Sequence, residues 1–147
     1  MNIVIFGPPG AGKGTQSKFI ANNFKLYQLS TGDLLRSEIK KKTKLGLEIS
    51  SIINSGELVS DKIVGDLIEK FIRNDTYRDK TIFDGYQRTI NQAKNLENFL
   101  KKYNQKIDLV LKLSVSLTTI KKRISERKNL EKRSDDSEEI AIKRYKM

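Results

Sequence analysis

The stretch Gly7-Pro8-Pro9-Gly10-Ala11-Gly12-Lys13-Gly14-Thr15 decides the fold of this 147-residue chain. An apolar run, Ile3 to Phe6, comes directly before it, and a helical pattern, Lys13 to Phe24, begins within it. Glycines between a strand and a helix let successive backbone N–H groups converge on an anion, and the N-terminus of the helix adds partial positive charge. Lys13 would reach the outer phosphates of a nucleotide as a point charge. The stretch therefore predicts a phosphate-binding loop.

Outside this loop, short apolar runs alternate with helical patterns. Runs that are rich in β-branched residues and bounded by turn residues suit parallel strands that are covered on both faces. Three such runs are clear and a fourth is weaker: Ile3 to Phe6, Thr81 to Phe83, Ile107 to Val115 and, as the weak one, Leu26 to Leu29. Because strands alternate with helices, we expect a three-layer α/β domain with a parallel sheet.

The helical patterns differ in how clearly their apolar residues indicate which face of the helix is buried. Between Ile63 and Ile72, apolar residues recur at the spacing of a half-buried helix. The first helical pattern places Phe19, Ile20 and Phe24 on one side. From residue 31 to residue 72, helical patterns follow one another with no strong strand between them. This predicts a small helical insertion carried on the sheet.

Charge and composition narrow the classes of function. The 29 Lys and Arg residues exceed the 18 Asp and Glu residues, so the net charge is +11 and an anionic partner is expected. The sequence has no Cys, which excludes a thiolate zinc site, and no His, which removes the commonest general base. No apolar run approaches the roughly 20 residues of a membrane helix, and the first residues lack the basic start of a signal peptide. We expect a cytoplasmic protein with no membrane partner.

The loop departs from the general phosphate-binding pattern at Gly14, where Ser or Thr usually follows the lysine. With this departure, the form Gly-x-Pro-Gly-Ala-Gly-Lys-Gly-Thr-Gln resembles the loop of adenylate kinases and related nucleoside monophosphate kinases. The resemblance continues in the same order across the whole chain. Its further segments are Ser30 to Arg36, Gly56 to Asp61, Asp84 to Thr89 with Gln92, the pair Arg123 and Arg127, Arg133 to Asp136, and Arg144.

The resemblance implies a magnesium-dependent transfer of a phosphoryl group from ATP to AMP, which gives two ADP. It implies a single P-loop kinase domain over residues 1–147, with an AMP-binding insertion at residues 30–59 and a short lid at about residues 127–135. We expect a monomer whose partners are ATP, AMP and ADP. Mg²⁺ is the expected cofactor, and zinc is not, because the zinc-binding form of the long lid requires Cys.

Three other functions stay open. A UMP/CMP kinase would have the same fold, but Thr31 and Gln92 favour adenine, because the pyrimidine enzymes of the family carry Ala and Asn at the matching places. A truncated nucleotide-binding form with little turnover is the second. A nucleic-acid binder is suggested by the net charge and ranks last, because the sequence lacks an interleaved aromatic platform. We therefore expect no nucleic-acid partner.

Each functional residue of the family is carried over to the matching position of this sequence. The resemblance implies that ATP is bound by Gly10, Ala11, Gly12, Lys13, Gly14, Thr15, Arg123 and Arg127. It implies that AMP is bound by Thr31, Arg36, Glu57, Leu58, Val59, Gly85, Tyr86, Arg88, Gln92, Arg133 and Arg144. It assigns catalysis to Lys13, Arg88, Arg123, Arg133 and Arg144. Asp84 would hold Mg²⁺ through water, with Thr15 as a second candidate ligand.

Phosphoryl transfer suits these residue types. The reaction needs little covalent help from the protein, but it needs several fixed positive charges, a metal and the exclusion of water. Arginine offers a planar, permanently charged fork for phosphate oxygens. Asp84 directly follows the apolar run Thr81 to Phe83, so it would lie at the carboxyl end of a strand beside the loop. A carboxylate that organises a metal is expected there.

Three features depart from the pattern of the family. Only five residues separate Arg127 from Arg133, which marks the form with a short lid. Gln87 replaces a proline that follows a cis peptide bond in the family, so the bond before Gln87 is either trans, which shifts the next arginine, or strained. The chain ends at Met147, whereas the family continues through a further strand and helix. We therefore expect the run from Ile107 to Val115 to form an exposed sheet edge.

The helical insertion and the short lid are the segments expected to close over the substrates before chemistry. They carry Arg36 and Arg133, for which the sequence indicates no structural partner. Repulsion between these arginines is expected to favour an open form without ligand.

Overall fold

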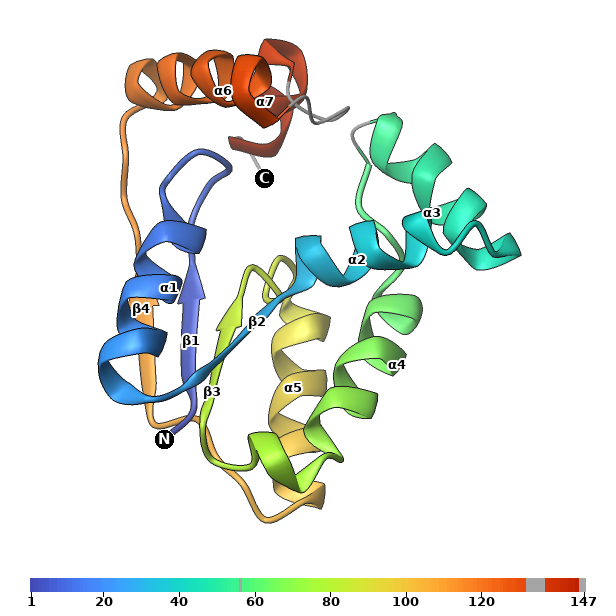
Figure 1. Ribbon diagram of the computed structural model, residues 1–147, viewed down its shortest axis with the longest axis vertical. Helices are drawn as coiled ribbons and strands as arrows, with labels where there is room; N and C mark the ends of the chain where they lie inside the picture. The colour runs from blue at the N-terminus through green and yellow to red at the C-terminus, as the bar shows by residue number, and fades with distance from the viewer. Residues whose placement is uncertain (56, 132–136, 146–147) are drawn as a thin grey trace.

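The computed structural model describes residues 1–55, 57–131 and 137–145 and consists of a parallel sheet with helices on both faces (Figure 1). In chain order, the strands are β1 (Ile3–Phe6), β2 (Tyr27–Ser30), β3 (Thr81–Asp84) and β4 (Leu109–Lys112). Their order across the sheet is β2-β3-β1-β4, and each neighbouring pair is parallel. The carboxyl ends of all four strands therefore meet at one end of the sheet.

Helices cover both faces of the sheet and its carboxyl end. They are α1 (Lys13–Phe24), α2 (Thr31–Lys40), α3 (Lys44–Asn54), α4 (Asp61–Ile72), a 3₁₀ helix (Asp75–Tyr77), α5 (Ile90–Lys102), α6 (Leu117–Glu131) and α7 (Glu138–Tyr145). Helix α1 packs on one face, and α4 and α5 pack on the other. Helices α6 and α7 lie beyond the carboxyl ends of the strands, and α2 and α3 extend to the side of them (Figure 1).

Side chains of the central strands alternate between two apolar cores. Ile3 and Ile5 pack with Ala21 of α1 on one face of the sheet. Val4 and Phe83 belong to the larger core on the opposite face, which includes side chains of α4 and α5. Successive side chains of a strand point to opposite faces, and both faces are covered here. This is why β1 and β3 are continuous apolar runs.

The predicted parallel α/β domain is confirmed, with differences at the ends of elements. The weak candidate at Leu26 to Leu29 is strand β2, shifted by one residue. The run from Ile107 to Val115 is paired only from Leu109 to Lys112, so its predicted length was wrong. The reason is its partner: β1 offers only four residues for pairing, Ile3–Phe6, and β4 pairs with no second strand in the described part of the chain.

The strongest helical pattern also forms as predicted. It is α4, in which Val64, Ile68 and Ile72 are buried. The Ser60 hydroxyl accepts a hydrogen bond from the Ile63 N–H at 3.4 Å and so caps the start of the helix. Residues 31–72 contain α2, α3 and α4 and no strand among the described residues.

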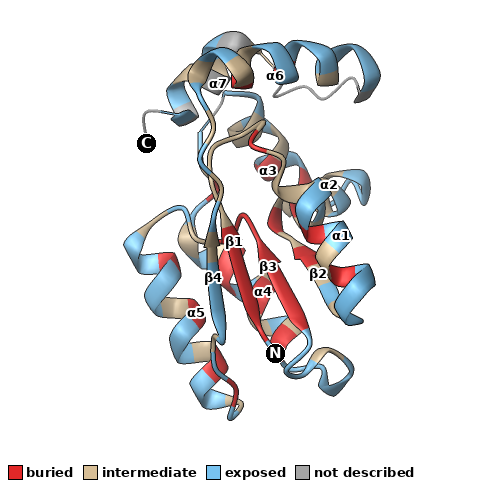
Figure 2. Ribbon diagram, turned by 90° about the vertical axis from the view of Figure 1, so that its left-hand side faces the viewer, coloured by how far each residue is buried: buried red, intermediate tan, exposed pale blue. Residues whose placement is uncertain are grey.

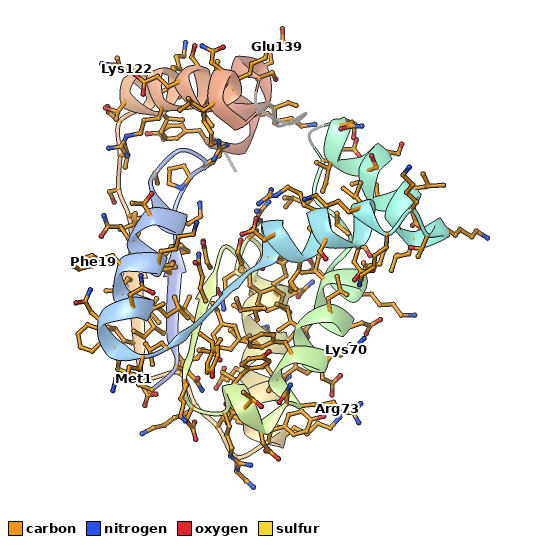
Figure 3. All side chains as sticks on the ribbon, in the orientation of Figure 1. Met1, Phe19, Lys70, Arg73, Lys122 and Glu139 are labelled. Atoms are coloured by element: carbon orange, nitrogen blue, oxygen red, sulfur yellow. The ribbon has the colours of Figure 1, made fainter. Side chains whose placement is uncertain are left out.

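Two surfaces expose apolar side chains. Among the described residues, strand β4 is an open edge of the sheet, as predicted, and its Leu109 and Val110 are exposed (Figure 2). The prediction that Phe19, Ile20 and Phe24 share one side of α1 was wrong for Ile20, which packs against the core. Phe19 is 64% and Phe24 62% exposed, and Phe19 points away from the sheet in Figure 3. Beside Ile20, the side of α1 that faces the sheet carries the small side chains Ser17 and Ala21, which let the helix approach closely.

None of the helices in the described ranges combines the length and the apolar character that crossing a membrane requires.

Candidate active site

The predicted phosphate-binding loop joins β1 to α1 at the carboxyl end of the sheet. Gly10 and Gly12 have φ angles of 77° and 93°, in the left-handed region that favours glycine. The Ala11 N–H donates to the Pro8 carbonyl at 3.2 Å and closes a tight turn. Gly12 directly precedes α1, so the N–H groups of the first helical turn open onto the loop. This backbone can receive an anion.

Lys13 lies between this loop and the end of β3. Its Nζ donates to the carbonyl oxygens of Gly7 at 2.8 Å and Pro8 at 3.0 Å, both of which belong to the loop. Its Cε lies 3.6 Å from the point where a Cβ on Gly85 would stand. The ammonium group is therefore held where it can exchange carbonyl oxygens for phosphate oxygens.

Asp84 ends β3 as a buried carboxylate, with 6% exposure. Its Oδ2 accepts a hydrogen bond from Gln28 Nε2 at 2.9 Å and lies 3.8 Å from the point where a Cβ on Gly14 would stand, so it faces the loop. Burial raises the pKa of Asp84 above its ordinary value, and the Gln28 hydrogen bond and the charge of Lys13 partly oppose that shift. The site thus holds a desolvated carboxylate beside a cation.

A polar cavity of about 470 Å³ opens between the loop, the carboxyl ends of β2 and β3, and α6. The Arg123 Nη1 donates to the carbonyls of Gly10 and Ala11, each at 3.3 Å, and so ties α6 to the loop. Arg36 pairs with Asp33 at 2.5 Å. Cations outnumber carboxylates in the lining, which includes Lys13, Lys18, Arg36, Arg88, Arg123 and Arg127 against Asp33 and Asp84. Such a cavity favours a multiply charged anion.

A second cavity, of about 710 Å³, adjoins the polar one. It extends along Leu58, Thr89 and Ala93 and past Gln87. The two cavities share Pro9, Lys13, Gly85 and Arg88 in their linings. Two ligands, one in each cavity, would therefore meet at the lysine and the arginine.

Among the residues predicted to contact the base of AMP, those with polar side chains that are buried are Thr31, Tyr86 and Gln92. The hydroxyls of Thr31 and Tyr86 have no hydrogen-bond partner among the described residues. Burial, and after it the charge of Asp61, raises the pKa of Tyr86 to about 12. Gln92 is paired on both sides: its Nε2 donates to Asp61 Oδ1 at 2.8 Å, and its Oε1 accepts from the Arg88 N–H at 2.9 Å.

Comparison with known proteins identifies the family. A family model described as adenylate kinase matches residues 5–147, nearly the whole chain. This chain belongs to the adenylate kinase family. The matched range includes the loop, both cavities and the described part of α6 and α7.

Adenylate kinases from several bacteria are similar to this chain. That of Pelagibacter ubique is 44% identical over 171 residues, which cover 99% of this chain and 80% of the relative. That of Mycoplasma mycoides is 46% identical over 127 residues, which cover 86% of this chain and 59% of the relative. That of Porphyromonas gingivalis is 42% identical over 144 residues, which cover 98% and 74%. The matched region thus spans 59% to 80% of the length of these three proteins.

The residues to which the adenylate kinase resemblance assigns ATP binding lie close together in the structure. Gly10, Gly12, Lys13, Gly14, Thr15, Arg123 and Arg127 line the polar cavity, and Ala11 is buried within the loop. The residues assigned to AMP are more dispersed. Arg36 lines the polar cavity, Leu58 lines the larger one, and Gly85 and Arg88 border both. Four of the remaining residues are buried, namely Thr31, Val59, Tyr86 and Gln92, and Glu57 is exposed. Arg133 lies outside the described residues, as do Asp135, Asp136 and the side chain of Arg144 in α7.

Two expectations are resolved by the geometry. None of the described peptide bonds is cis, so the bond before Gln87 is trans. Arg88 is nevertheless anchored, because its Nε donates to the Gly85 carbonyl at 3.0 Å. The expectation that Arg36 lacks a structural partner was wrong, since Asp33 lies three residues earlier on α2, at a spacing where helical side chains meet.

Sequence reasoning missed Gln28, and it gave Asp61 no role beyond its place at the end of the segment Gly56 to Asp61. Gln28 lies in the weak strand β2, opposite Ile82 of β3, and only that register brings it to Asp84. Asp61 follows Ser60 at the start of α4, where an acidic residue is already explained by the helix dipole. Because the helix dipole already accounts for an acidic residue there, the contact of Asp61 with α5 was not predicted.

Proposed function

We propose that this protein transfers the γ-phosphoryl group of ATP to AMP in the presence of Mg²⁺ and so forms two ADP. The observation that carries the proposal is the polar cavity, in which Lys13 and four arginines from three segments surround a phosphate-binding loop. Membership in the adenylate kinase family supports the same reaction. The reaction requires fixed positive charge around the moving group rather than a nucleophile or base on the protein.

The charged residues of the site divide between the phosphoryl donor, ATP, and the phosphoryl acceptor, AMP. The backbone of the loop and Lys13 would bind the outer phosphates of ATP, and Arg123 and Arg127 would bind them from α6. Arg36 and Arg88 would hold the AMP phosphate on the other side of the transferred group. Arg88 borders both cavities, so it lies where the two nucleotides would meet. Arg133 and Arg144 are assigned to the same phosphates by the family resemblance. Charge that spreads over the transferred group is then met by donors already in position.

Mg²⁺ fits the residues beside the loop. Asp84 offers a buried carboxylate that faces Gly14, and Thr15 lines the same cavity. Within the described ranges, no three His, Cys, Asp or Glu side chains gather around one point, so the ion would be held by Asp84 through water, by Thr15 and by nucleotide phosphates. The ion supplies positive charge that offsets the charge of the phosphates.

The base of AMP would lie against Gly85, Tyr86 and the main chain of Glu57, Leu58 and Val59. Thr31 and Gln92 would contact its polar edge. The unpartnered hydroxyl of buried Thr31 supports this role, because a buried polar group without a partner is costly unless a ligand supplies one.

Closure would complete the site. The insertion at residues 30–59, which contains α2 and α3, and the short lid at residues 127–135 are the segments that would exclude water from the phosphates. We infer that the protein acts as a monomer in the cytoplasm, because its proposed partners, ATP, AMP and ADP, are small soluble nucleotides. No nucleic-acid or membrane partner is needed for this function.

A coupled assay of ADP formation tests the proposal. AMP, CMP, UMP and GMP are compared as acceptors, with and without Mg²⁺. We expect ADP formation that depends on Mg²⁺ and a kcat/KM that is highest for AMP. A higher value for CMP or UMP would assign the protein to the pyrimidine kinases of the same fold. Binding of nucleotides without turnover would favour a nucleotide-binding form.

A further inference from the structure

We propose that Asp61 is a positioning residue that fixes the orientation of the Gln92 amide and so decides which base edge the monophosphate site accepts. This role rests on the proposed function, which puts Gln92 beside the base of the nucleotide acceptor. Asp61 touches neither phosphates nor reacting atoms in this account, and it acts through Gln92.

The evidence is a set of hydrogen bonds that joins the starts of α4 and α5. Asp61 Oδ1 accepts from Gln92 Nε2 at 2.8 Å, and its Oδ2 accepts from Thr89 Oγ1 at 3.0 Å. Thr89 Oγ1 in turn accepts from the Gln92 N–H at 3.1 Å and caps α5. Gln92 Oε1 accepts from the Arg88 N–H at 2.9 Å. We call these four residues the Asp61–Gln92 network.

The chemistry of the two neighbours leaves the amide one orientation. A carboxylate only accepts hydrogen bonds, so it must face the Gln92 NH₂ group. A backbone N–H only donates, so Arg88 must face the Gln92 oxygen. A flipped amide would set oxygen against the Asp61 carboxylate and NH₂ against the Arg88 N–H. Gln92 is only 2% exposed, so solvent cannot compensate for those two mismatches.

The locked amide keeps one N–H and one oxygen lone pair for a ligand. At its polar edge, adenine presents an amino donor at position 6 and an acceptor at N1. Hypoxanthine presents the reverse, an oxygen acceptor at position 6 and an N1–H donor. Only a flipped amide would suit hypoxanthine in the same place. The Asp61 carboxylate therefore selects adenine by holding Gln92 in the orientation that matches it.

Asp61→Asn tests this role, because an asparagine amide has almost the same shape and can present either a donor or an acceptor to Gln92. The variant and the unchanged protein are titrated by calorimetry with AMP and with inosine monophosphate, so the readout does not depend on turnover. We expect the preference for AMP to fall by about tenfold or more. AMP affinity itself should fall by only about twofold, since two amide orientations become comparably populated. ATP affinity should stay unchanged.

Asp66→Asn is the matched control. It makes the same change of charge on the same helix, at an exposed position outside the network, and should leave the preference unchanged. If Asp61→Asn loses helical circular dichroism, Asp61→Ser carries the test, because serine also favours helix starts and its hydroxyl both donates and accepts.

The outcomes separate this role from the proposed function. A folded Asp61 variant that keeps the original preference would overturn the role, and so would an equal loss of preference in Asp66→Asn or a protein that binds both monophosphates equally. A preference that is lost only in the Asp61 variant supports the role. If the same protein binds AMP selectively but makes no ADP, the proposed function fails while the role of Asp61 stands.

Discussion

The polar cavity and the Asp61–Gln92 network hold their polar groups in opposite ways. In the cavity, Lys13 and Arg123 bond to loop carbonyls and Arg36 bonds to Asp33, and an arriving phosphate can replace these partners. In the network, the Gln92 side chain is buried, and one N–H and one lone pair of its amide are paired with Asp61 and with the Arg88 N–H. We infer from this difference that exchangeable charge serves the transfer of the phosphoryl group, whereas fixed pairing serves the choice of base. Changes in the cavity should therefore alter the rate most, and changes on the base side should alter selectivity.

The largest effect is expected from Lys13→Ala. Loss of this ammonium removes positive charge from the junction of the two cavities, and kcat should fall by about 10²–10³-fold with the fold intact. The coupled assay and circular dichroism measure the two quantities. Lys70→Ala, at an exposed position on α4, is the control and should leave kcat unchanged. Turnover of Lys13→Ala within a factor of a few of the unchanged protein would reject its role.

Arg88→Lys should have the next largest effect. The substitution keeps the charge but loses the planar fork that can bind two phosphate oxygens at once, so kcat/KM for AMP should fall by about 10- to 100-fold. The KM for ATP should change little, because Arg88 is assigned to the acceptor. Steady-state kinetics with each nucleotide varied in turn separates the two. Equal losses for both nucleotides would contradict the division between donor and acceptor.

Thr31→Val tests how much a single buried hydroxyl contributes to binding the base of AMP. The hydroxyl is buried and unpartnered among the described residues, so its removal should leave the Tm of the free protein unchanged or raise it. The kcat/KM for AMP should fall by about tenfold, because the ligand loses its partner. Thermal melts without nucleotide and kinetics with AMP measure both effects. A lower Tm with normal kinetics would mean that Thr31 has a structural role only.

Asp84→Asn should make the protein without nucleotide slightly more stable. Burial raises the pKa of Asp84 in the folded protein, so the folded state holds its proton more tightly than the unfolded state does. Stability attributable to this group is therefore lost as pH rises above the ordinary range of Asp. At pH 7, without nucleotide or Mg²⁺, the substitution should raise Tm by about 2–4 °C.

The pH dependence checks the cause of that gain. Below the ordinary pKa of Asp, the carboxyl is protonated in both states, and the gain should vanish. A gain that persists at low pH would mean that something other than the buried charge sets the difference.

Much of the fold follows from the sequence because its signals are local. Apolar runs around the glycine-rich loop predict β1 and β3, and the apolar spacing from Ile63 to Ile72 predicts α4. The polar cavity was also predictable, since carboxyl ends of parallel strands must meet and the loop follows the first of them. These features depend on neighbours in the chain or on the rule that parallel strands share one direction.

The rest depends on contacts that no local pattern encodes. The two largest apolar side chains of α1, Phe19 and Phe24, are exposed, so the helical pattern alone could not show that Ser17 and Ala21 face the sheet. Gln28 meets Asp84 only through the register of β2 with β3. Asp61 meets Gln92 across 31 positions in the chain, and either residue taken alone has an ordinary explanation at the start of a helix.

The most direct test of the account follows the transferred group itself. The protein, in excess, is mixed with Mg²⁺, AMP and ATP that is labelled in its γ-phosphoryl group, and the products of a single turnover are separated. The account predicts that the label moves into ADP, with little in inorganic phosphate, and that Lys13→Ala slows this movement. Label that appears in inorganic phosphate at the same rate with and without AMP would contradict phosphoryl transfer between the two cavities.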